Sequence, residues 1–216
     1  MSIRRLFCSR RRIENGIFSI SGDEAYHGTT VLRLRKGDEV RVFTEQGSEF
    51  LCRVIATGKG QLRAEIVEKL EDTVESPLQL HLIQGMPKAA KLEQVIVHGT
   101  ELGMTALHPA ICERSVKSGD KRERWRKLAL EAAKQSGRRL IPQVQPAMAL
   151  KEMDFSQFDG FLKLVAAEPP LGGSLRGIIG GADSPSGAVV VIGPEGGFTH
   201  EELEFLTNQG FQPFTL

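Results

Sequence analysis

The chain has 216 residues, of which 40% are hydrophobic and 25% are charged, and its net charge at pH 7 is +1. This length suits one large or two small domains with a substantial core, and the composition is that of a globular protein. No apolar run approaches the roughly 18 residues of a membrane span, and the arginine-rich N-terminus lacks the apolar core of a signal peptide. The three cysteines are odd in number, widely spaced and without a CxxC pair, which favours reduced thiols in a cytoplasmic protein. With no HxxxH pair either, no metal site is expected.

The first 70 or so residues are typical of a small β-barrel. Runs of strand-forming residues occur at 40–43 and 50–55, and residues 62–67 alternate between apolar and polar. A short helical stretch at about 23–34 interrupts this pattern. The polar segment 71–77 ends in proline and is typical of a linker.

Beyond the linker, strands and helices alternate, which predicts an α/β domain with a mainly parallel sheet. Strands are expected at 78–84, 105–112, 161–167, 188–192 and 211–216, the second being broken or ended near Pro109. Helices are expected at about 92–102, around Trp125, at 175–179 and at 201–208. Trp125 lies on the apolar face of its helix, so we expect it in the core.

The segment from Ile192 to Thr199 (IGPEGGFT) is the most informative part of the chain. Four apolar residues precede it, and Thr199 stands three residues before Glu202, the spacing of a capping box that opens a helix. Glycines at such a turn let the backbone approach a ligand closely. No GxGxxG or GxxxxGK[ST] motif is present, and Glu195 would repel a phosphate, so the turn suits a ligand with hydrogen-bond donors or positive charge. A tight connection without a ligand remains the alternative.

Positive charge is concentrated between Glu113 and Arg139, where ten Lys and Arg residues face four acidic residues. A cluster of this kind suits the phosphate backbone of a nucleic acid. The alternative is a solvated helix face with i,i+4 ion pairs such as Glu123 with Lys127.

Seven motifs in order resemble the RsmE family of ribosomal RNA methyltransferases, which belongs to the SPOUT superfamily. The first four are HGTTVLR at 27–33 with Gly37-Asp38, QGMPKAAKLE at 84–93, TELG at 100–103 and PAICERSV at 109–116. Trp125, EAAKQSGRRLIP at 131–142 and the segment Ile192–Thr199 complete the series. The resemblance covers essentially the whole chain.

The resemblance implies a small PUA-like β-barrel domain at 1–72, followed at 73–216 by a SPOUT-type α/β domain with a trefoil knot. The family continues its last strand with a motif of the form LGxRILRxETA and a closing helix. Only Leu216, the expected first residue of that motif, is present in this chain. We therefore expect a C-terminal tail, which supplies part of the cofactor pocket in the family, to be missing.

The resemblance also implies a site for S-adenosylmethionine. The residues expected around the cofactor are Leu164, Ile192, Gly193, Pro194, Glu195, Gly196, Gly197 and Leu216. The family methylates the ring imide nitrogen, N3, of a uridine in 16S ribosomal RNA of the small ribosomal subunit. Glu195 is the candidate base for the imide proton; binding of cofactor or substrate, and hydrogen bonding within its own turn, remain open.

RNA contacts are expected from both domains, through residues Arg4, Arg5, Arg33, Lys88, Arg114, Gln135, Arg138 and Arg139. For Arg4 and Arg5 a disordered basic terminus is the alternative, and Gln135 could instead cap its helix. The family works as a homodimer in the cytoplasm, with no membrane and no metal involved. Two other functions remain open: a non-catalytic RNA-binding or ribosome-assembly protein on the same fold, and a SPOUT methyltransferase that acts on transfer RNA.

Overall fold

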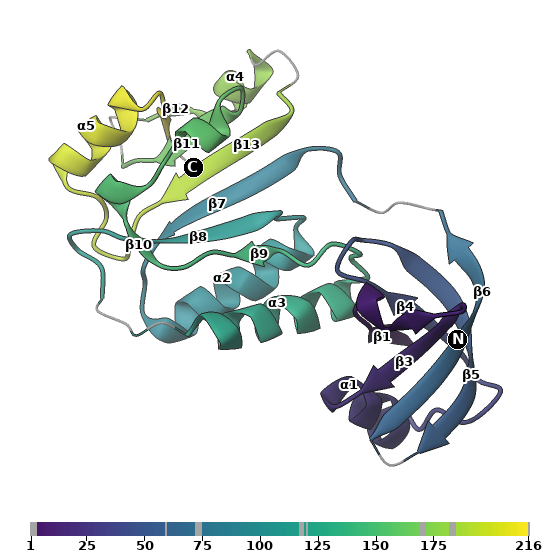
Figure 1. Ribbon diagram of the computed structural model, residues 1–216. Helices are drawn as coiled ribbons and strands as arrows, with labels where there is room; N and C mark the ends of the chain where they lie inside the picture. Colours follow the sequence, from purple (N-terminus) through teal and green to yellow (C-terminus); the bar gives the residue numbers. More distant parts are fainter. Residues whose placement is uncertain are drawn as a thin grey trace. The chain divides into compact units, whose positions relative to one another are not determined.

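The computed structural model describes residues 4–58, 60–71, 75–116, 119, 121–168, 172–181 and 185–215, with the side chains of Arg10 and Ala89 left out. The chain divides into two compact units (Figure 1). The first comprises Met1–Glu75 together with Ala133–Ile141, and the second comprises Ser76–Ala132 together with Pro142–Leu216. Among the described residues no helix is both long and apolar enough to cross a membrane.

The first unit is built on a sheet in which six strands are described, in the order β1-β4-β5-β6-β3-β2. The strands are β1 (Arg5–Phe7), β2 (Ile13–Glu14), β3 (Ile17–Ser21), β4 (Glu39–Phe43), β5 (Glu49–Gly58) and β6 (Gln61–Leu70). All neighbours are antiparallel except β1 and β4. Between β3 and β4 lie a short helix α1 (Asp23–Tyr26) and a π-helical turn η2 (His27–Val31), and the 3-10 turn η1 (Arg10–Arg12) follows β1.

Buried apolar residues alternate with exposed polar ones along the strands, so one face of this sheet packs into the core of the unit. Leu62 and Ala64 of β6, for example, are fully buried, whereas their neighbours in sequence are exposed. They pack with Phe18, Val40 and other apolar residues in one cluster. The predicted strands at 40–43, 50–55 and 62–67 are therefore confirmed, while β1, β2 and β3 were not foreseen.

Buried ion pairs join segment 133–141 to the rest of the first unit. Glu49, whose side chain is 3% exposed, accepts hydrogen bonds from Nε of Arg5 at 2.8 Å and from Nε of Arg139 at 2.9 Å. Glu75 accepts from Nη2 of Arg138 at 2.8 Å and from the backbone N–H groups of Arg139 and Leu140 at 2.7 and 3.0 Å. These hydrogen bonds, with desolvation opposing them, lower the pKa of Glu75. The segment thus belongs to the first unit by specific charge pairing.

The second unit is an α/β structure on a sheet in which eight strands are described, with the order β10-β8-β7-β13-β11-β14-β12 and β9 paired to β8. The strands are β7 (Gln79–Gly85), β8 (Ala106–Ile111), β9 (Gln143–Val144), β10 (Met148–Ala149), β11 (Leu162–Ala166), β12 (Gly173–Ser174), β13 (Gly187–Ile192) and β14 (Gln212–Thr215). The helices are α2 (Ala89–Glu101), α3 (Arg122–Ser136), α4 (Leu175–Gly180) and α5 (His200–Asn208), with 3-10 turns η3 (Leu150–Glu152) and η4 (Ser156–Phe158). All pairs of neighbouring strands described in this sheet are parallel, which confirms the predicted α/β class with a mainly parallel sheet.

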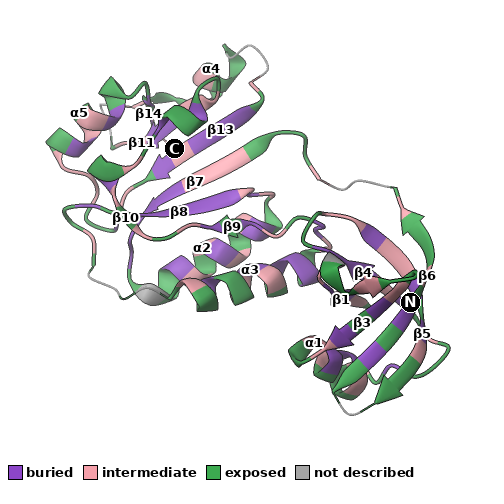
Figure 2. Ribbon diagram, viewed as in Figure 1, coloured by how far each residue is buried: buried purple, intermediate pink, exposed green. Residues whose placement is uncertain are grey.

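The two faces of this sheet are covered by different parts of the unit. Helix α2 and the neighbouring part of α3 lie along one side of β7 and β8 (Figure 1), and the buried Trp125 of α3 is 1% exposed, as predicted. On the other side, Val189 and Val191 of β13 pack with Phe158 and Leu206. Figure 2 shows the central strands as the most buried part of the sheet. All three cysteines are free and buried, in agreement with the prediction of reduced thiols.

The expectation that the second strand breaks near Pro109 is wrong. Strand β8 continues through Pro109, which lies opposite Gln84 of β7. On the other side of β8, β9 pairs with residues 106–107 and β10 with residues 110–111. On that side the carbonyl of Leu107 accepts from the backbone N–H of Gln145. Residues two apart in a strand point the same way, so the nitrogen of Pro109 points between β9 and β10, where no described strand pairs with it. No ladder hydrogen bond is therefore lost at the proline.

Two stacked histidines lie between the sheet and its covering aromatic residues. Nδ1 of His81 lies 3.1 Å from Nε2 of His108, and the ring of Phe158 contacts both rings edge-on. Burial lowers the pKa of both imidazoles, and the neighbouring His81 adds to the effect at His108, whose pKa falls from 6.5 to about 4. Both rings are therefore neutral in the folded chain at neutral pH.

Replacing Glu49 with Gln should destabilise the first unit by about 3 kcal/mol, because two buried guanidinium groups lose their shared counter-charge. Glu71→Gln is the matched control, since Glu71 is 78% exposed and pairs with Lys69 at the surface; its effect should stay below about 1 kcal/mol. Calorimetric unfolding of both variants measures the difference. Equal unfolding temperatures for Glu49→Gln and Glu71→Gln would show that the ion pairs of Glu49 do not stabilise the unit.

The unfolding free energy should fall as the pH drops from 6.5 towards 4. The unfolded chain binds protons at its histidines in this range, whereas the folded chain does not until the pH approaches the lowered pKa of His108, about 4. The loss from His108 should approach about 3 kcal/mol. His108→Leu should flatten the profile, and the control His98→Gln, at an exposed position, should leave its slope unchanged. Urea unfolding at several pH values tests this, and parallel curves for wild type and His108→Leu would refute it.

Candidate functional site

The carboxyl ends of the parallel strands meet at one edge of the second unit's sheet, where the chain forms a cavity of about 610 Å³. The glycine-rich loop after β13, residues 193–198, forms part of its wall. The described lining residues are Arg114, Ala166, Ala167, Glu168, Ile192, Gly193, Pro194, Gly196, Gly197, Phe198, His200, Leu203, Phe214 and Thr215. A cavity of this size, largely apolar with backbone groups at its wall, is suited to a small organic molecule.

Helix α5 begins directly after this loop through the predicted capping box. Oγ1 of Thr199 accepts from the backbone N–H of Glu202 at 3.2 Å, and the Thr199 N–H donates to Oε2 of Glu202 at 2.9 Å. The other carboxylate oxygen of Glu202 accepts from the N–H of Glu113 at 2.8 Å. Glu202 is 3% exposed, so one buried carboxylate joins the start of α5 to the loop that follows β8.

Gln84, near the end of β7, holds the beginning of the glycine-rich loop. Its buried Nε2 donates to the carbonyls of Gly85 at 3.0 Å and Gly193 at 3.1 Å, and lies 3.4 Å from the carbonyl of Ile192. The loop passes so close to β7 that a Cβ atom at Gly85 would lie 2.6 Å from Cδ of Pro194. Gly85 is therefore required by a close approach of two backbone segments.

Arg114 holds the far side of the same loop. Its Nη1 donates to the carbonyl of Gly196 at 2.9 Å and lies 3.4 Å from that of Phe198. A Cβ atom at Gly196 would meet the Arg114 side chain at 3.3 Å, and Gly197 has a φ of +68°, which favours glycine. Arg114 is exposed and also lines the cavity, so its guanidinium combines a structural role with access to a ligand.

Glu195 has the environment of a loop anchor. Its carboxylate accepts from its own backbone N–H, from the N–H of Lys88 at 3.3 Å and from the Lys91 ammonium at 3.3 Å. These interactions, the backbone hydrogen bond within Glu195 first, lower the pKa of the carboxyl group, which makes it a weaker base. The alternative that Glu195 hydrogen bonds within its own turn matches this geometry.

The other described residues that were expected around a cofactor lie in two different places. Ile192, Gly193, Pro194, Gly196 and Gly197 line the cavity. Leu164 lies within β11, is 3% exposed and is absent from the described lining. The cavity is instead lined by residues 166–168, just beyond the end of that strand, and by Phe214 and Thr215 of β14. Leu216 lies outside the described residues.

Three of the arginines expected to contact RNA are engaged in ion pairs inside the first unit. Arg5, Arg138 and Arg139 have side chains only 12%, 8% and 8% exposed, respectively, and are paired with Glu49 or Glu75. Arg5 also donates to the carbonyls of Ala133 and Arg138 at 3.1 and 3.0 Å. Buried, neutralised guanidinium groups of this kind are not available to a phosphate.

The other residues expected to contact RNA lie at the surface. Arg4, Arg33, Lys88, Arg114 and Gln135 are exposed. Arg33 adopts a φ of +54°, which is uncommon for a residue with a side chain. The surface ion pair of Glu123 is formed with Arg126 at 3.0 Å rather than with Lys127 as expected.

No group of three or more His, Cys, Asp or Glu side chains that could hold a metal ion occurs within the described ranges. The polar side chains that line the cavity are those of Arg114, Glu168, His200 and Thr215.

Comparison with known protein families gives two matches. Residues 74–216 match a family described as an RNA methyltransferase domain, and residues 20–67 match one described as an RNA methyltransferase PUA domain. Among curated proteins, the chain is 34% identical to the ribosomal RNA small subunit methyltransferase E of Bacillus subtilis (strain 168), over 93% of this chain and 83% of that protein.

Solved structures of similar proteins include two with a bound methyl donor. One is a ribosomal RNA small subunit methyltransferase E from Neisseria gonorrhoeae bound to S-adenosyl methionine, with a TM-score of 0.85 and 28% identity over 99% of this chain and 89% of that one. The other is a putative methyltransferase from Legionella pneumophila in complex with the cofactor SAM, with a TM-score of 0.88 and 28% identity over 100% and 90% of the two chains.

Replacing Gly85 with Ala should destabilise the second unit by about 1–3 kcal/mol, because the new methyl group overlaps Pro194 and must push the loop away from β7. Gly180→Ala is the matched control, since a Cβ atom there meets nothing within 4 Å and the backbone is not in the left-handed region. Thermal unfolding compares the two variants. A Gly85→Ala protein as stable as the control would show that the close approach is not a constraint.

Proposed function

Because the chain belongs to the ribosomal RNA small subunit methyltransferase E family, we propose that it methylates N3 of a uridine in 16S ribosomal RNA, using S-adenosylmethionine. The observation that carries this proposal is the cavity at the glycine-rich loop, at the edge of a parallel sheet where such folds bind ligands. The PUA match to the first unit supports an RNA substrate.

The size and the lining of the cavity support the proposed cofactor. The loop leaves backbone uncovered at Gly193, Gly196 and Gly197, and Ile192 and Phe214 supply apolar wall. A Cβ atom added at Gly193 would lie 3.2 Å from Cε2 of the Phe198 ring, so a side chain there would press on that ring. The amino-acid end and the adenine of the cofactor are polar groups that backbone N–H and C=O groups recognise, so residues 192–197 would hold it.

Bound S-adenosylmethionine supplies a methyl group on a sulfonium, which is the electrophile. The protein then has to orient the uridine, exclude water and favour loss of the imide proton. Arg114 lines the cavity and carries a permanent positive charge, so we assign it the stabilisation of charge that develops on the ring carbonyls. Glu195 is left as a positioning residue, because its lowered pKa and its three hydrogen-bonding partners suit a loop anchor better than a base.

The residues proposed to contact RNA are Arg4, Arg33 and Gln135 in the first unit and Lys88 and Arg114 in the second, all of them exposed. We further infer that the protein acts in the cytoplasm as a homodimer. Helix α5 is the candidate dimer surface, because a hollow of about 320 Å³ runs along His200, Leu203, Glu204, Thr207 and Asn208.

The full-length protein should transfer a methyl group to small-subunit ribosomal RNA isolated from a strain that lacks this methyltransferase. Gly196→Leu should weaken S-adenosylmethionine binding at least about tenfold, because the side chain would fill the cavity beside Arg114. Gly180→Leu, at an open position, should bind normally. Calorimetry, radiolabel transfer and mapping of the modified nucleotide provide the measurements.

Absence of transfer to ribosomal RNA, together with salt-sensitive RNA binding, would favour a non-catalytic RNA-binding protein instead. Unaltered cofactor binding by Gly196→Leu would contradict the site assignment. Transfer to transfer RNA alone would contradict the proposed substrate.

A further inference from the structure

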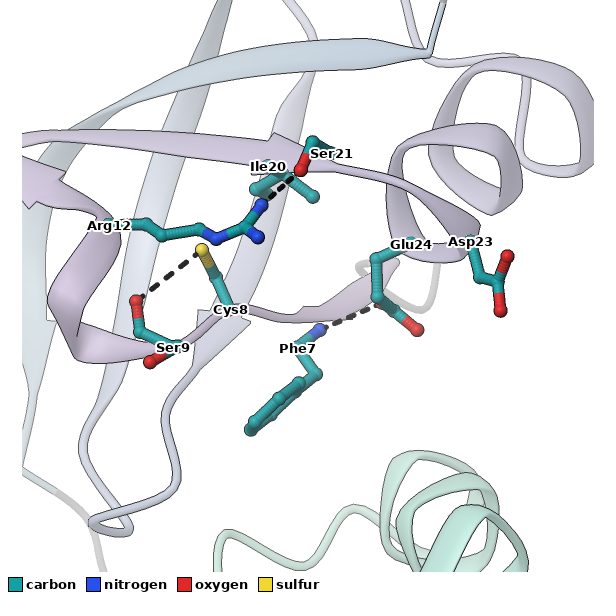
Figure 3. Close-up of a pocket in the computed structure, with 8 residues that line it drawn as sticks. All are labelled: Phe7, Cys8, Ser9, Arg12, Ile20, Ser21, Asp23 and Glu24. Atoms are coloured by element: carbon teal, nitrogen blue, oxygen red, sulfur yellow. Dashed lines mark hydrogen bonds between the residues drawn. The ribbon is translucent and has the colours of Figure 1, made fainter. Parts of the chain in front are cut away.

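The first unit contains a separate cavity of about 260 Å³ between β1, β3 and α1 (Figure 3). Cys8 and Ile20 form its floor and are only 3% and 2% exposed. Burial raises the pKa of the Cys8 thiol to about 11, so the floor is uncharged at neutral pH. The cavity therefore offers an apolar surface of limited size, large enough for one small group.

Hydrogen-bonding groups of opposite character stand on the two sides of this floor. On one side the Arg12 side chain reaches past Cys8 and donates to Oγ of Ser21 (Figure 3). On the other side stands Glu24, whose Oε2 accepts from the N–H of Phe7 at 3.0 Å. A guanidinium has five N–H donors and a carboxylate about four acceptor positions. Both groups therefore retain capacity beyond these bonds.

The charge of Glu24 is balanced from within the unit. Its Oε1 lies 2.6 Å from the ammonium of Lys134, whose side chain is 6% exposed. The carboxylate thus presents acceptor oxygens to the cavity without adding uncompensated negative charge. Arg12, which lines the cavity, and its neighbour Arg11 are both exposed and belong to the turn η1. These arginines can attract a polyanion, although the carboxylates of Asp23 and Glu24 also line the cavity.

We propose that this cavity binds a guanine base of the RNA substrate. Guanine presents acceptors at O6 and N7 and donors at N1 and N2. The cavity matches this pattern, with the Arg12 guanidinium facing the acceptor edge and the Glu24 carboxylate facing the donor edge. The uncharged floor of Cys8 and Ile20 contacts the face of the ring. Adenine lacks the second donor and the O6 acceptor, so it satisfies one wall at most.

This inference rests on the proposed function only in that RNA is the partner; it requires neither the methyl donor nor the cavity of the second unit. Half of the pocket, residues 7–12, lies outside the segment that matches the PUA family. The pocket is therefore a feature of this chain's own N-terminal strand and turn as well as of the matched barrel.

The test uses fluorescent single-stranded RNA of sequence UUUGUUU, and the same RNA with adenosine or inosine at the central position. Binding to the full chain is followed by anisotropy at low salt without S-adenosylmethionine. Wild type should bind the guanosine RNA about tenfold more tightly than the adenosine RNA, with inosine between them because it lacks the N2 donor. Arg12→Ala should reduce this ratio to about one.

Ser21→Trp is the second variant, because Ser21 lines the cavity and a large side chain there would occupy it and cover Cys8 and Ile20. It should also abolish the preference for guanosine. Arg53→Ala is the control: Arg53 is an exposed arginine of the same unit, paired with Glu39 at 3.6 Å and absent from this cavity. It should weaken binding of all three RNAs equally.

Equal binding of the three RNAs by wild type, or a guanosine preference that survives Ser21→Trp, would overturn the proposal. Methyl transfer to ribosomal RNA, measured separately on wild type, distinguishes failure of this pocket from failure of the proposed function.

Discussion

A glycine-rich loop has few side chains with which to hold its own shape, so its conformation depends on hydrogen bonds from its neighbours. In this chain the loop after β13 is held at its start by the amide of Gln84 and at its far side by the guanidinium of Arg114. Glu202 secures the backbone where the loop enters α5. The entropy of ordering a flexible segment is thus lost on folding rather than on binding, which favours affinity for a ligand.

These contacts come from the ends of separate strands, which explains why a parallel sheet suits the site. Gln84 precedes the end of β7, Arg114 follows β8, and residues 166–168 follow β11. In a parallel sheet all these ends lie at one edge. Gln84 therefore hydrogen bonds to Gly193, 109 positions away in the sequence, and no single segment contains the site.

The parts of this arrangement that depend on residues close together in the sequence could be predicted from the sequence. The capping box of Thr199 and Glu202 depends on three-residue spacing, and the structure has it with both hydrogen bonds. The alternation of strands and helices likewise predicted the parallel sheet. Pro109 was misjudged because a proline in a strand is tolerated where no neighbour needs its N–H, and only the pairing of β9 and β10 shows that gap.

The charges were harder to interpret, because a count of residues does not distinguish a solvated arginine from a buried one. Arg138 and Arg139 belong to the most basic stretch of the chain, yet their partners are Glu75 and Glu49, 63 and 90 positions away. Leu164 shows the same limitation for apolar residues, since a strand pattern does not tell which residue faces a cavity and which the core. Arg12 and Glu24 lay in segments without a recognisable motif, and only the folded barrel brings them to one pocket.

The discontinuity of the first unit has a consequence for synthesis. Its last described strand ends at Leu70, but Glu24 and Glu75 find their cationic partners in Ala133–Ile141, and Glu49, already paired with Arg5, finds its second partner there. At about 5–20 residues per second, the ribosome needs several more seconds to add the intervening stretch. During that interval the nascent barrel carries carboxylates without their counter-ions. Its assembly is therefore finished only after most of the chain has been translated.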